Sequence, residues 1–398
     1  MMRHIALLVS LAVFLAGCGQ EQAVREERAV NAIEALEGNV TRDDKLPGHP
    51  VVGVYLNIDP KATDADLKVL KEFKGLQELI LSGTNITDSG LKHLKELGSL
   101  RTLGLCGTGI TDAGLSELKE LVGLEVLALA NTKVTGIGLK ELKALRALHY
   151  LDLSFTKITD AGLKDLKEIE GLRTLLLIND TRVTDVGMKD LGELKGLRDL
   201  NLNGTRITDS GLKNLKVLKD LQALNIGGTA ITDAGLSELR ELAGLEVLAL
   251  ANTKVTDIGM KELKGLRSLR LLILIGIPIT DAGLISLQEL DGLRDLYLGN
   301  TPITDANLKQ IGELKGLHNL DLGCTGITDA GLKGLRELKG LQELNLAATR
   351  VTDAGMKELK ELKGLQRLDL AETRVTDAGA RELQQALPKV RILGLHPR

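Results

Sequence analysis

The sequence is poor in aromatic residues: it has no tryptophan, three tyrosines and three phenylalanines among 398 residues, 2% in all. Its 51 basic and 54 acidic residues nearly balance, which gives a formal net charge of −3. Nucleic-acid binding usually depends on a basic surface with aromatic side chains. This composition therefore argues against nucleic acid as a partner.

Motifs that bind metals or carry catalysis are also missing. His149 and His318 belong to neither an H-x-x-x-H nor an H-E-x-x-H pattern, so we expect no metal site. The GTGITDAG segment that begins at Gly107 resembles a phosphate-binding loop, but no G-K-[ST] follows it. We expect no cofactor and a non-enzymatic protein, with an enzyme as the least favoured alternative.

No apolar run at the amino terminus is long enough to cross a membrane. The run from Ile5 to Gly17 has thirteen residues, whereas a spanning helix needs about 20. A secretory signal peptide over residues 1–17 fits better. Its end, LAGC, resembles the lipobox of bacterial lipoproteins, in which the Cys, here Cys18, becomes the lipidated first residue of the mature chain. An ordinary cleaved signal with an incidental Cys is the alternative.

The lipobox resemblance implies a location at a bacterial cell envelope. Gly19 is not the Asp associated with inner-membrane retention, so the outer membrane or cell surface is favoured. Residues 18–50 would form a tether or an amino-terminal cap; as coil, this segment would span about 30 Å. Within it, Val30, Ile33 and Leu36 fall at roughly helical spacing, and Gly38 could end such a helix.

From Leu76 onward the sequence repeats every 24 residues, with one spacing of 25. The frame is L-x-x-L-x-L-x-x-T-x-[IV]-T, and Ile277 replaces its first Thr once. The thirteen letters GLEVLALANTKVT stand at Gly123–Thr135 and again at Gly244–Thr256, which indicates that a block of turns was duplicated. Such a duplication lengthens a scaffold without changing its packing.

This frame resembles the leucine-rich repeat, with Thr where that family commonly has Asn or Cys. The resemblance covers residues 51–398, about 14 turns, and implies an α/β fold: a solenoid that is a right-handed β-α superhelix. Leu79 and Leu81 should lie in a short strand and face the protein core. Thr87 should cap a helix whose Leu91, Leu94 and Leu97 also face the core. Packed helices need about 8 to 10 Å between axes and paired strands only about 4.8 Å. The parallel sheet should therefore line the concave face of an arc.

The exposed strand positions vary from turn to turn and indicate a binding surface. One turn, LRLLILIGIPIT, breaks the frame and should expose three apolar side chains, which Val247, Ala249 and Ala251 would extend. A polar field that includes Asp295 borders it. An apolar centre beside polar groups is common in binding surfaces, so we expect the ligand contacts at Leu271, Ile273, Ile275, Tyr297, Asp321, Asn345 and Asp369. The alternative is that these residues pack together or lie on a merely solvated sheet.

The acidic and amide-rich part of this face would suit a basic protein segment or a polyhydroxylated glycan. A basic residue follows the frame Thr in seven turns, and these residues should line one rim of the arc. There they would either keep the loops soluble or attract anionic envelope polymers. The residues are Lys133, Lys157, Arg182, Arg206, Lys254, Arg350 and Arg374.

Cys106 and Cys324 are nine turns apart, too far for a disulfide, and should be small fillers near strand ends. The sequence thus favours a lipid-anchored, protein-binding scaffold; a structural or adhesive envelope protein without a discrete ligand is the alternative.

Overall fold

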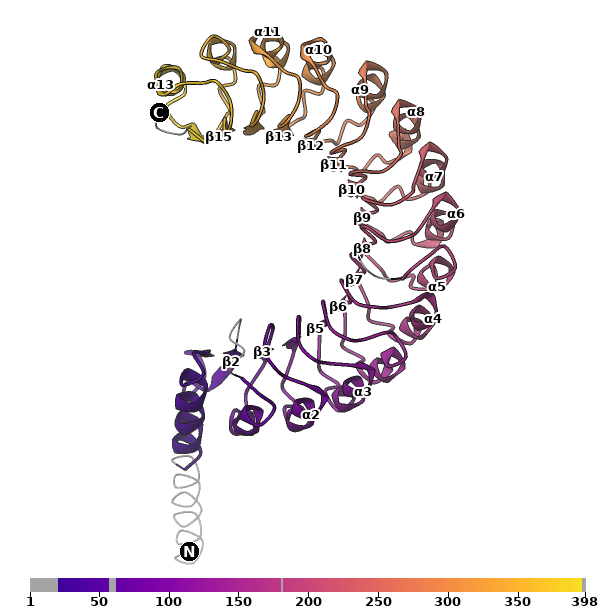
Figure 1. Cartoon of the computed structure of the whole chain (residues 1–398), viewed down its shortest axis with the longest axis vertical. Coiled ribbons are helices and arrows are strands. Elements are labelled where there is room, and N and C mark those ends of the chain that lie inside the picture. Colours follow the sequence, from indigo (N-terminus) through magenta and orange to yellow (C-terminus); the bar gives the residue numbers. More distant parts are fainter. Residues whose placement is uncertain (1–20, 57–61, 180–181, 396–398) are drawn as a thin grey trace, which may run out of the picture. The chain divides into compact units, whose positions relative to one another are not determined.

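The computed structural model describes residues 21–56, 62–179 and 182–395. The expected signal peptide and Cys18 lie outside these residues. The chain divides into two compact units, Met1–Leu176 and Leu177–Arg398. Both are built from the same strand-and-helix repeat, and within each unit the strands lie on the inner edge and the helices on the outer edge (Figure 1).

In the first unit, β1 pairs with β2 in antiparallel fashion, and each later strand pairs in parallel with the one before it. The strands are β1 (Asn39–Arg42), β2 (Val51–Tyr55), β3 (Glu78–Ile80), β4 (Thr102–Gly104), β5 (Val126–Ala128), β6 (Tyr150–Asp152) and β7 (Thr174–Leu176). The α-helices of its repeats are α2 (Asp88–Leu91), α3 (Asp112–Leu115) and α4 (Asp160–Leu163). The 3-10 helices are η1 (Asp66–Glu72), η2 (Lys92–Leu94), η3 (Ser116–Leu118), η4 (Leu139–Ala144) and η5 (Lys164–Glu168).

In the second unit, all strand pairs are parallel and follow chain order. The strands are β8 (Asp199–Asn201), β9 (Ala223–Asn225), β10 (Val247–Ala249), β11 (Leu271–Ile273), β12 (Asp295–Tyr297), β13 (Asn319–Asp321), β14 (Glu343–Asn345), β15 (Arg367–Asp369) and β16 (Arg391–Leu393). The α-helices are α5 (Met188–Leu191), α6 (Asp209–Leu212), α7 (Asp233–Leu236), α8 (Asp257–Met260), α9 (Asp281–Leu287), α10 (Leu308–Gly312), α11 (Asp329–Leu332), α12 (Met356–Leu359) and α13 (Asp377–Ala386). The 3-10 helices are η6 (Leu215–Val217), η7 (Ser237–Leu239), η8 (Lys261–Gly265), η9 (Asp305–Asn307) and η10 (Lys333–Leu335).

The repeat leucines form the core, as the sequence predicts. Leu79, Leu81, Leu91 and Leu94 are fully buried and Leu97 is 4% exposed. Burying such a side chain contributes roughly 1.5–3 kcal/mol, so the interior grows by a similar amount with every turn. The helices are shorter than expected: α2 has four residues and continues as η2, so Leu97 lies beyond the helical segment.

The frame Thr satisfies a backbone carbonyl of its own turn, and it is buried in the described repeats except at Thr373, which is half-buried. Thr84 Oγ1 donates to the Leu81 carbonyl oxygen at 2.6 Å, and the same bond recurs from Thr108 to Thr373 in the described repeats that keep the frame Thr. Ile277 is equally buried, at 1% exposed, but it has no hydroxyl to donate. The Leu274 carbonyl oxygen still accepts the backbone bond from Ile277 N, at 3.3 Å.

The residue before the frame position has a positive φ in every described repeat, which explains its composition. The described repeats contain twelve such positions, and eight of them hold Gly or Asn. These two residues adopt a positive φ at the least energetic cost. Cys324 occupies one of them, with φ 56° and an exposed side chain. Our expectation of a small filler near the strand end is therefore wrong for Cys324, because its side chain is exposed. Cys106 is half-buried, and both thiols are free.

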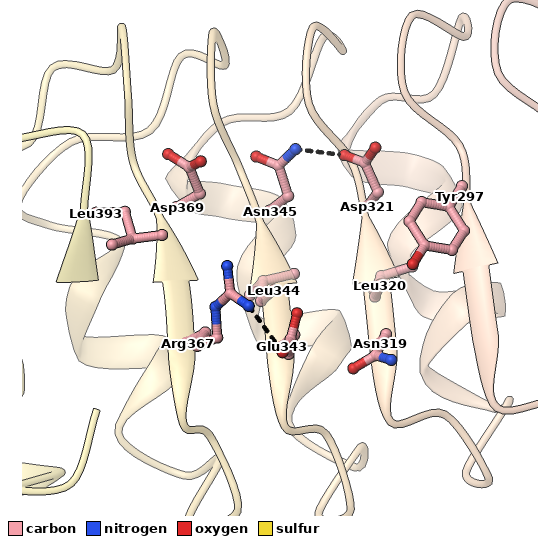
Figure 2. Close-up of a pocket in the computed structure, with 10 residues that line it drawn as sticks. All are labelled: Tyr297, Asn319, Leu320, Asp321, Glu343, Leu344, Asn345, Arg367, Asp369 and Leu393. Carbon is pink, nitrogen blue, oxygen red and sulfur yellow. Dashed lines mark hydrogen bonds and ion pairs between the residues drawn. The ribbon is translucent and has the colours of Figure 1, made fainter. Parts of the chain in front are cut away.

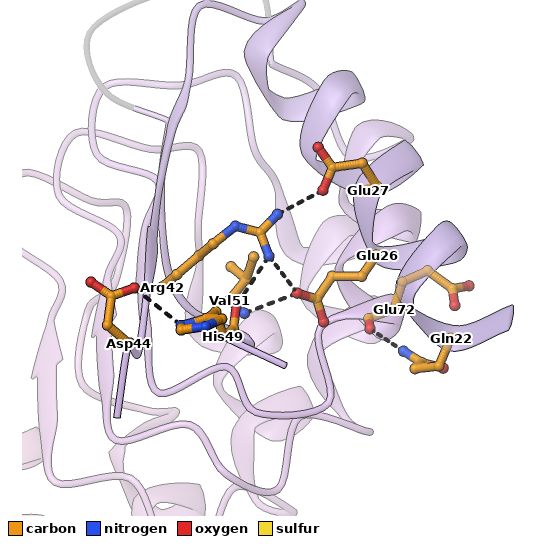
Figure 3. Close-up of polar contacts among 8 residues, drawn as sticks. All are labelled: Gln22, Glu26, Glu27, Arg42, Asp44, His49, Val51 and Glu72. Carbon is orange, nitrogen blue, oxygen red and sulfur yellow. Dashed lines mark hydrogen bonds and ion pairs between the residues drawn. The ribbon is translucent and has the colours of Figure 1, made fainter. Parts of the chain in front are cut away.

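The described residues before the first repeat are folded rather than extended as a coil. Residues 21–34 are helical, and Ala29, Val30 and Ile33 are at most 4% exposed. Arg42 joins this helix to β1 through Glu26 Oε1 at 3.1 Å and Glu27 Oε2 at 2.8 Å (Figure 3). The segment thus covers the apolar end of the first repeats.

Over the described ranges, every helix is too short or too polar to span a bilayer.

Candidate functional site

A shallow hollow of about 200 Å³ lies on the open face of the sheet between β12 and β16 (Figure 2). Its polar lining comes from Tyr297, Asn319, Asp321, Glu343, Asn345, Arg367 and Asp369, and its apolar lining from Leu320, Leu344 and Leu393. All of these residues belong to the second unit. The hollow contains both hydrogen-bonding groups and aliphatic surface.

The three-residue strands explain why these side chains gather there. In β12, β13 and β14 the middle Leu is buried, while the first and third residues are only half-buried. Because the strands are in register, the third residues form one row and the first residues another. The third-position row consists of Tyr297, Asp321, Asn345 and Asp369. The first-position row consists of Asp295, Asn319, Glu343 and Arg367.

Backbone N–H groups fix the polar residues of the third-position row. Asp321 Oδ1 accepts from Gly323 N at 2.9 Å and from Asn345 Nδ2 at 2.7 Å. Asp369 Oδ1 accepts from Ala371 N at 2.9 Å. Among the described residues, none donates a hydrogen bond to the second carboxylate oxygen of either Asp. Each carboxylate is thus held in place by one oxygen while the other stays open to a ligand.

The first-position row is partly paired within itself. Arg367 Nη1 lies 3.3 Å from Glu343 Oε1, and the Asn319 amide donates to Asp295. The Arg367 and Glu343 side chains remain 56% and 46% exposed, so solvent screens this ion pair. Three carboxylates against one guanidinium leave the lining of the hollow acidic.

Tyr297 lies at the edge of the acidic lining and keeps its proton. Partial burial raises its pKa above the usual value of 10.0, and the negative charges of Asp295, Glu343 and Asp321 raise it further. The side chain is therefore a neutral phenol at physiological pH. It can offer a hydroxyl donor and an aromatic face to the same ligand.

The expected apolar surface lies on β11, next to Tyr297, and is narrower than the sequence indicates. Leu271, Ile273 and Ile275 are half-buried on the open face. Ala249, however, is only 5% exposed, which corrects our expectation that it extends this surface. Its methyl group lies between the longer Asn225 and Ile273 side chains of the paired strands, and they shield it.

The structure brings four of the seven expected contact residues into the hollow: Tyr297, Asp321, Asn345 and Asp369. Leu271, Ile273 and Ile275 do not line it but adjoin it, since Ile273 pairs with Tyr297 across the sheet. Our reading of the sequence missed Asn319 and Leu393. Both occupy half-buried positions on the open face of the sheet, so reading the first-position row and the closing strand in the same way would have found them. The basic residues that follow the frame Thr are exposed where we expected them, as Lys133, Lys254 and Arg350 show.

Within the described ranges, no three His, Cys, Asp or Glu side chains are grouped so that they could hold a metal ion.

Family models for leucine-rich repeats match two parts of the chain: "Leucine-rich repeat region" at residues 58–229 and "Leucine Rich repeat" at residues 317–335. None of the curated proteins matches the sequence. Among solved structures, an internalin from Listeria monocytogenes is 24% identical, with a TM-score of 0.61 over 93% of this chain and 95% of that one. A leucine-rich-repeat protein from Leptospira interrogans is 26% identical, with a TM-score of 0.58 over 82% of this chain and 80% of that one. Together with the repeat frame, these matches show leucine-rich repeats at residues 58–229 and 317–335 and a leucine-rich-repeat fold.

Proposed function

We propose that this chain is a non-enzymatic scaffold that binds a partner protein and is displayed at a bacterial cell envelope through a lipid on Cys18. The binding role rests on one observation above all. Asp321 and Asp369 are fixed by backbone donors at one oxygen and open at the other, which is how a pre-organised polar site is built. The leucine-rich-repeat fold supports this role by supplying a rigid sheet face.

The chemistry of the hollow favours a partner segment with both basic and apolar side chains. The acidic lining would attract a Lys or Arg, while Ile273 and its neighbours on β11 would take an aliphatic side chain. Tyr297 stands between the two regions and could contact both. Tyr is common among the residues that dominate binding energy.

Replacing Ile273 and Tyr297 together with Ser is the test of this site. We expect capture of the partner, measured by crosslinking in intact envelopes and quantitative mass spectrometry, to fall at least about tenfold. The thermal unfolding curve should change little, because these side chains lie outside the Leu interior.

Ile258→Ser provides the matched control, since this apolar side chain is 66% exposed at the first turn of α8. Capture by that variant should equal that of the unchanged chain. If the double variant captures as much partner as the control does, the surface is not the binding site. A collapsed unfolding curve would show instead that Ile273 and Tyr297 belong to the core.

The lipid anchor is tested separately. Cys18→Ser should lower the membrane-bound fraction at least about fivefold or accumulate unprocessed precursor, because acyl chains supply the membrane affinity. Cys106→Ser, which changes a half-buried thiol, should leave that fraction unchanged. Membrane fractionation with immunoblotting measures both. A correctly cleaved Cys18→Ser chain that stays in the membrane fraction would contradict the anchor.

A further inference from the structure

A basic surface lies on the helical side of the first unit, where the amino-terminal helix meets the first repeats. Two adjoining hollows of about 430 and 390 Å³ share Lys68 and Lys71 in their linings. Their other cationic lining residues include two arginines of the amino-terminal helix and two lysines of the next repeat. We call this set the basic patch: Arg25, Arg28, Lys68, Lys71, Lys92 and Lys95.

The charge of the patch is opposite in sign to that of the whole chain. Six cations face only Glu72 and Glu96 in the linings of the two hollows, which leaves a balance of +4, whereas the chain as a whole carries −3. Lys95 is paired with Glu117 at 2.7 Å and Arg25 with Glu21, so these two contribute least. The excess positive charge therefore centres on Arg28, Lys68, Lys71 and Lys92.

Two acidic residues of the amino-terminal helix, Glu26 and Glu27, are directed away from this charge. Arg42 engages both Glu26 and Glu27 (Figure 3). On the opposite side, Gln22 Nε2 donates to the Glu72 carbonyl oxygen at 2.7 Å and holds the helix against η1. Arg25 and Arg28 are thus kept beside Lys68 and Lys71, while the carboxylates of Glu26 and Glu27 are paired with Arg42.

An exposed apolar side chain accompanies the cations. Val24 is 52% exposed and lies four residues before Arg28, on the same face of the helix. The basic patch therefore has one exposed aliphatic side chain beside its cations.

We propose that the basic patch binds the anionic phospholipid headgroups of the membrane to which the chain is anchored. This inference rests on the proposed lipid at Cys18. Arg25 follows Cys18 by seven residues, a stretch that cannot exceed about 25 Å even when fully extended. An anchored chain must therefore hold the patch close to the bilayer, and each Lys or Arg near an anionic surface adds to the attraction. The patch then orients the first unit with its amino-terminal helical side toward the lipid.

The test uses the full chain, purified from membranes and reconstituted into vesicles of phosphatidylcholine alone or mixed with phosphatidylglycerol. Lysine acylation, followed residue by residue with mass spectrometry, reports which side chains are covered. We expect Lys68, Lys71 and Lys92 to react about fivefold more slowly on the anionic vesicles. Molar salt should abolish this protection, because it shortens the Debye length to about 3 Å. The exposed Lys213 and Lys216 should react equally on both kinds of vesicle.

Charge-reversal variants complete the experiment. Lys68→Glu with Lys71→Glu should remove the protection of Lys92, whereas Lys213→Glu with Lys216→Glu should preserve it; circular dichroism checks that both variants fold. Flotation with the vesicles reports the anchor independently. If the chain floats with both kinds of vesicle but Lys68, Lys71 and Lys92 react equally on both, the anchor stands and headgroup binding is contradicted. Protection that appears only after an envelope protein is added would assign the patch to a protein partner and overturn the inference.

Discussion

Replacing Asp112 with Ala is expected to lower the free energy of unfolding of the first unit by about 3 kcal/mol. The Asp112 carboxylate accepts hydrogen bonds from the following repeat: from Thr135 Oγ1 at 2.6 Å, Gly136 N at 3.1 Å and Gly138 N at 3.0 Å. Gly136 and Gly138 are buried. Without the carboxylate their N–H groups would stay unsatisfied away from water, and such groups cost roughly 1–3 kcal/mol each.

Urea unfolding followed by circular dichroism measures the change, and hydrogen exchange of peptides from each unit assigns it. Asp377→Ala is the matched control. Asp377 is the equivalent residue of α13, after which the described residues continue with β16 alone, and it is exposed. Its loss should cost under about 1 kcal/mol, the usual effect of a carboxylate at a helix N-terminus. Equal losses in the two variants would show that the bonds between repeats contribute nothing to stability.

The pH dependence gives a second signature of the same carboxylate. Burial by itself raises the pKa of Asp112, but hydrogen bonds from the Thr135 side chain and from the Gly138, Thr135 and Gly136 N–H groups outweigh it, so the pKa is lowered. A carboxyl whose pKa is lower in the folded state stabilises the fold above its unfolded pKa, about 3.9. That contribution disappears as the pH falls through the folded value. The difference between Asp112→Ala and the unchanged chain should therefore shrink below about pH 4.

The same bond joins other repeats, and it is the main stabilising feature that sequence reasoning missed. Asp88 Oδ2 accepts from Thr111 Oγ1 at 2.6 Å, and Asp233 Oδ2 accepts from Thr256 Oγ1 at 2.8 Å. From the sequence, the Thr-Asp pair indicates only the start of a helix. That part is confirmed at Thr87, which caps α2 by accepting from Ser89 N. The contact across 23 residues depends on the distance between stacked turns, which a local pattern cannot show.

Periodicity predicts the interior well because every turn places the same position in the same environment. It predicts exposure less well where neighbouring turns carry side chains of different length. Ala249 is one case: strand alternation places it on the open face, but the longer Asn225 and Ile273 shield it. The amino-terminal segment is another case, since it lies outside the repeat frame. Its burial of Ile33 depends on long-range packing that no frame encodes.

The candidate site was predictable as a row of residues but not as a hollow. The alternation of the strands places Tyr297, Asp321, Asn345 and Asp369 side by side. The depth of the hollow, and the carboxylate oxygens that accept no hydrogen bond, depend on which backbone N–H group each side chain binds. Asp321, for example, accepts a hydrogen bond from Gly323 N. Those bonds follow from the turn after each strand, where the chain reverses toward its helix.

Reversing the charge of Asp321 and Asp369 together is expected to weaken partner capture at least about 100-fold. A basic partner segment would lose its attraction to two carboxylates and would be repelled by two lysines. A loss of about 1.4 kcal/mol of binding free energy at each position already gives a roughly 100-fold weaker affinity. The third-position side chains lie outside the Leu interior, so Asp321→Lys with Asp369→Lys should still fold, as circular dichroism would show. The concentration of partner at half-maximal crosslinking measures the effect.

The control carries the same change of net charge on the helical side of the same unit. Glu289→Lys with Asp291→Lys alters two exposed carboxylates that do not line the hollow. Long-range attraction depends on net charge and falls with added salt, so both double variants would lose it alike. A contact made inside the hollow is lost only with Asp321 and Asp369, and that loss persists at high salt because partly buried pairs are screened less. Equal weakening by the two double variants would therefore reduce the role of the hollow to general attraction.

The milder variant Asp321→Asn with Asp369→Asn removes the charges but keeps side-chain carbonyls that can accept from Gly323 N and Ala371 N. A tenfold loss of capture in this variant would assign binding to the two open carboxylate oxygens themselves.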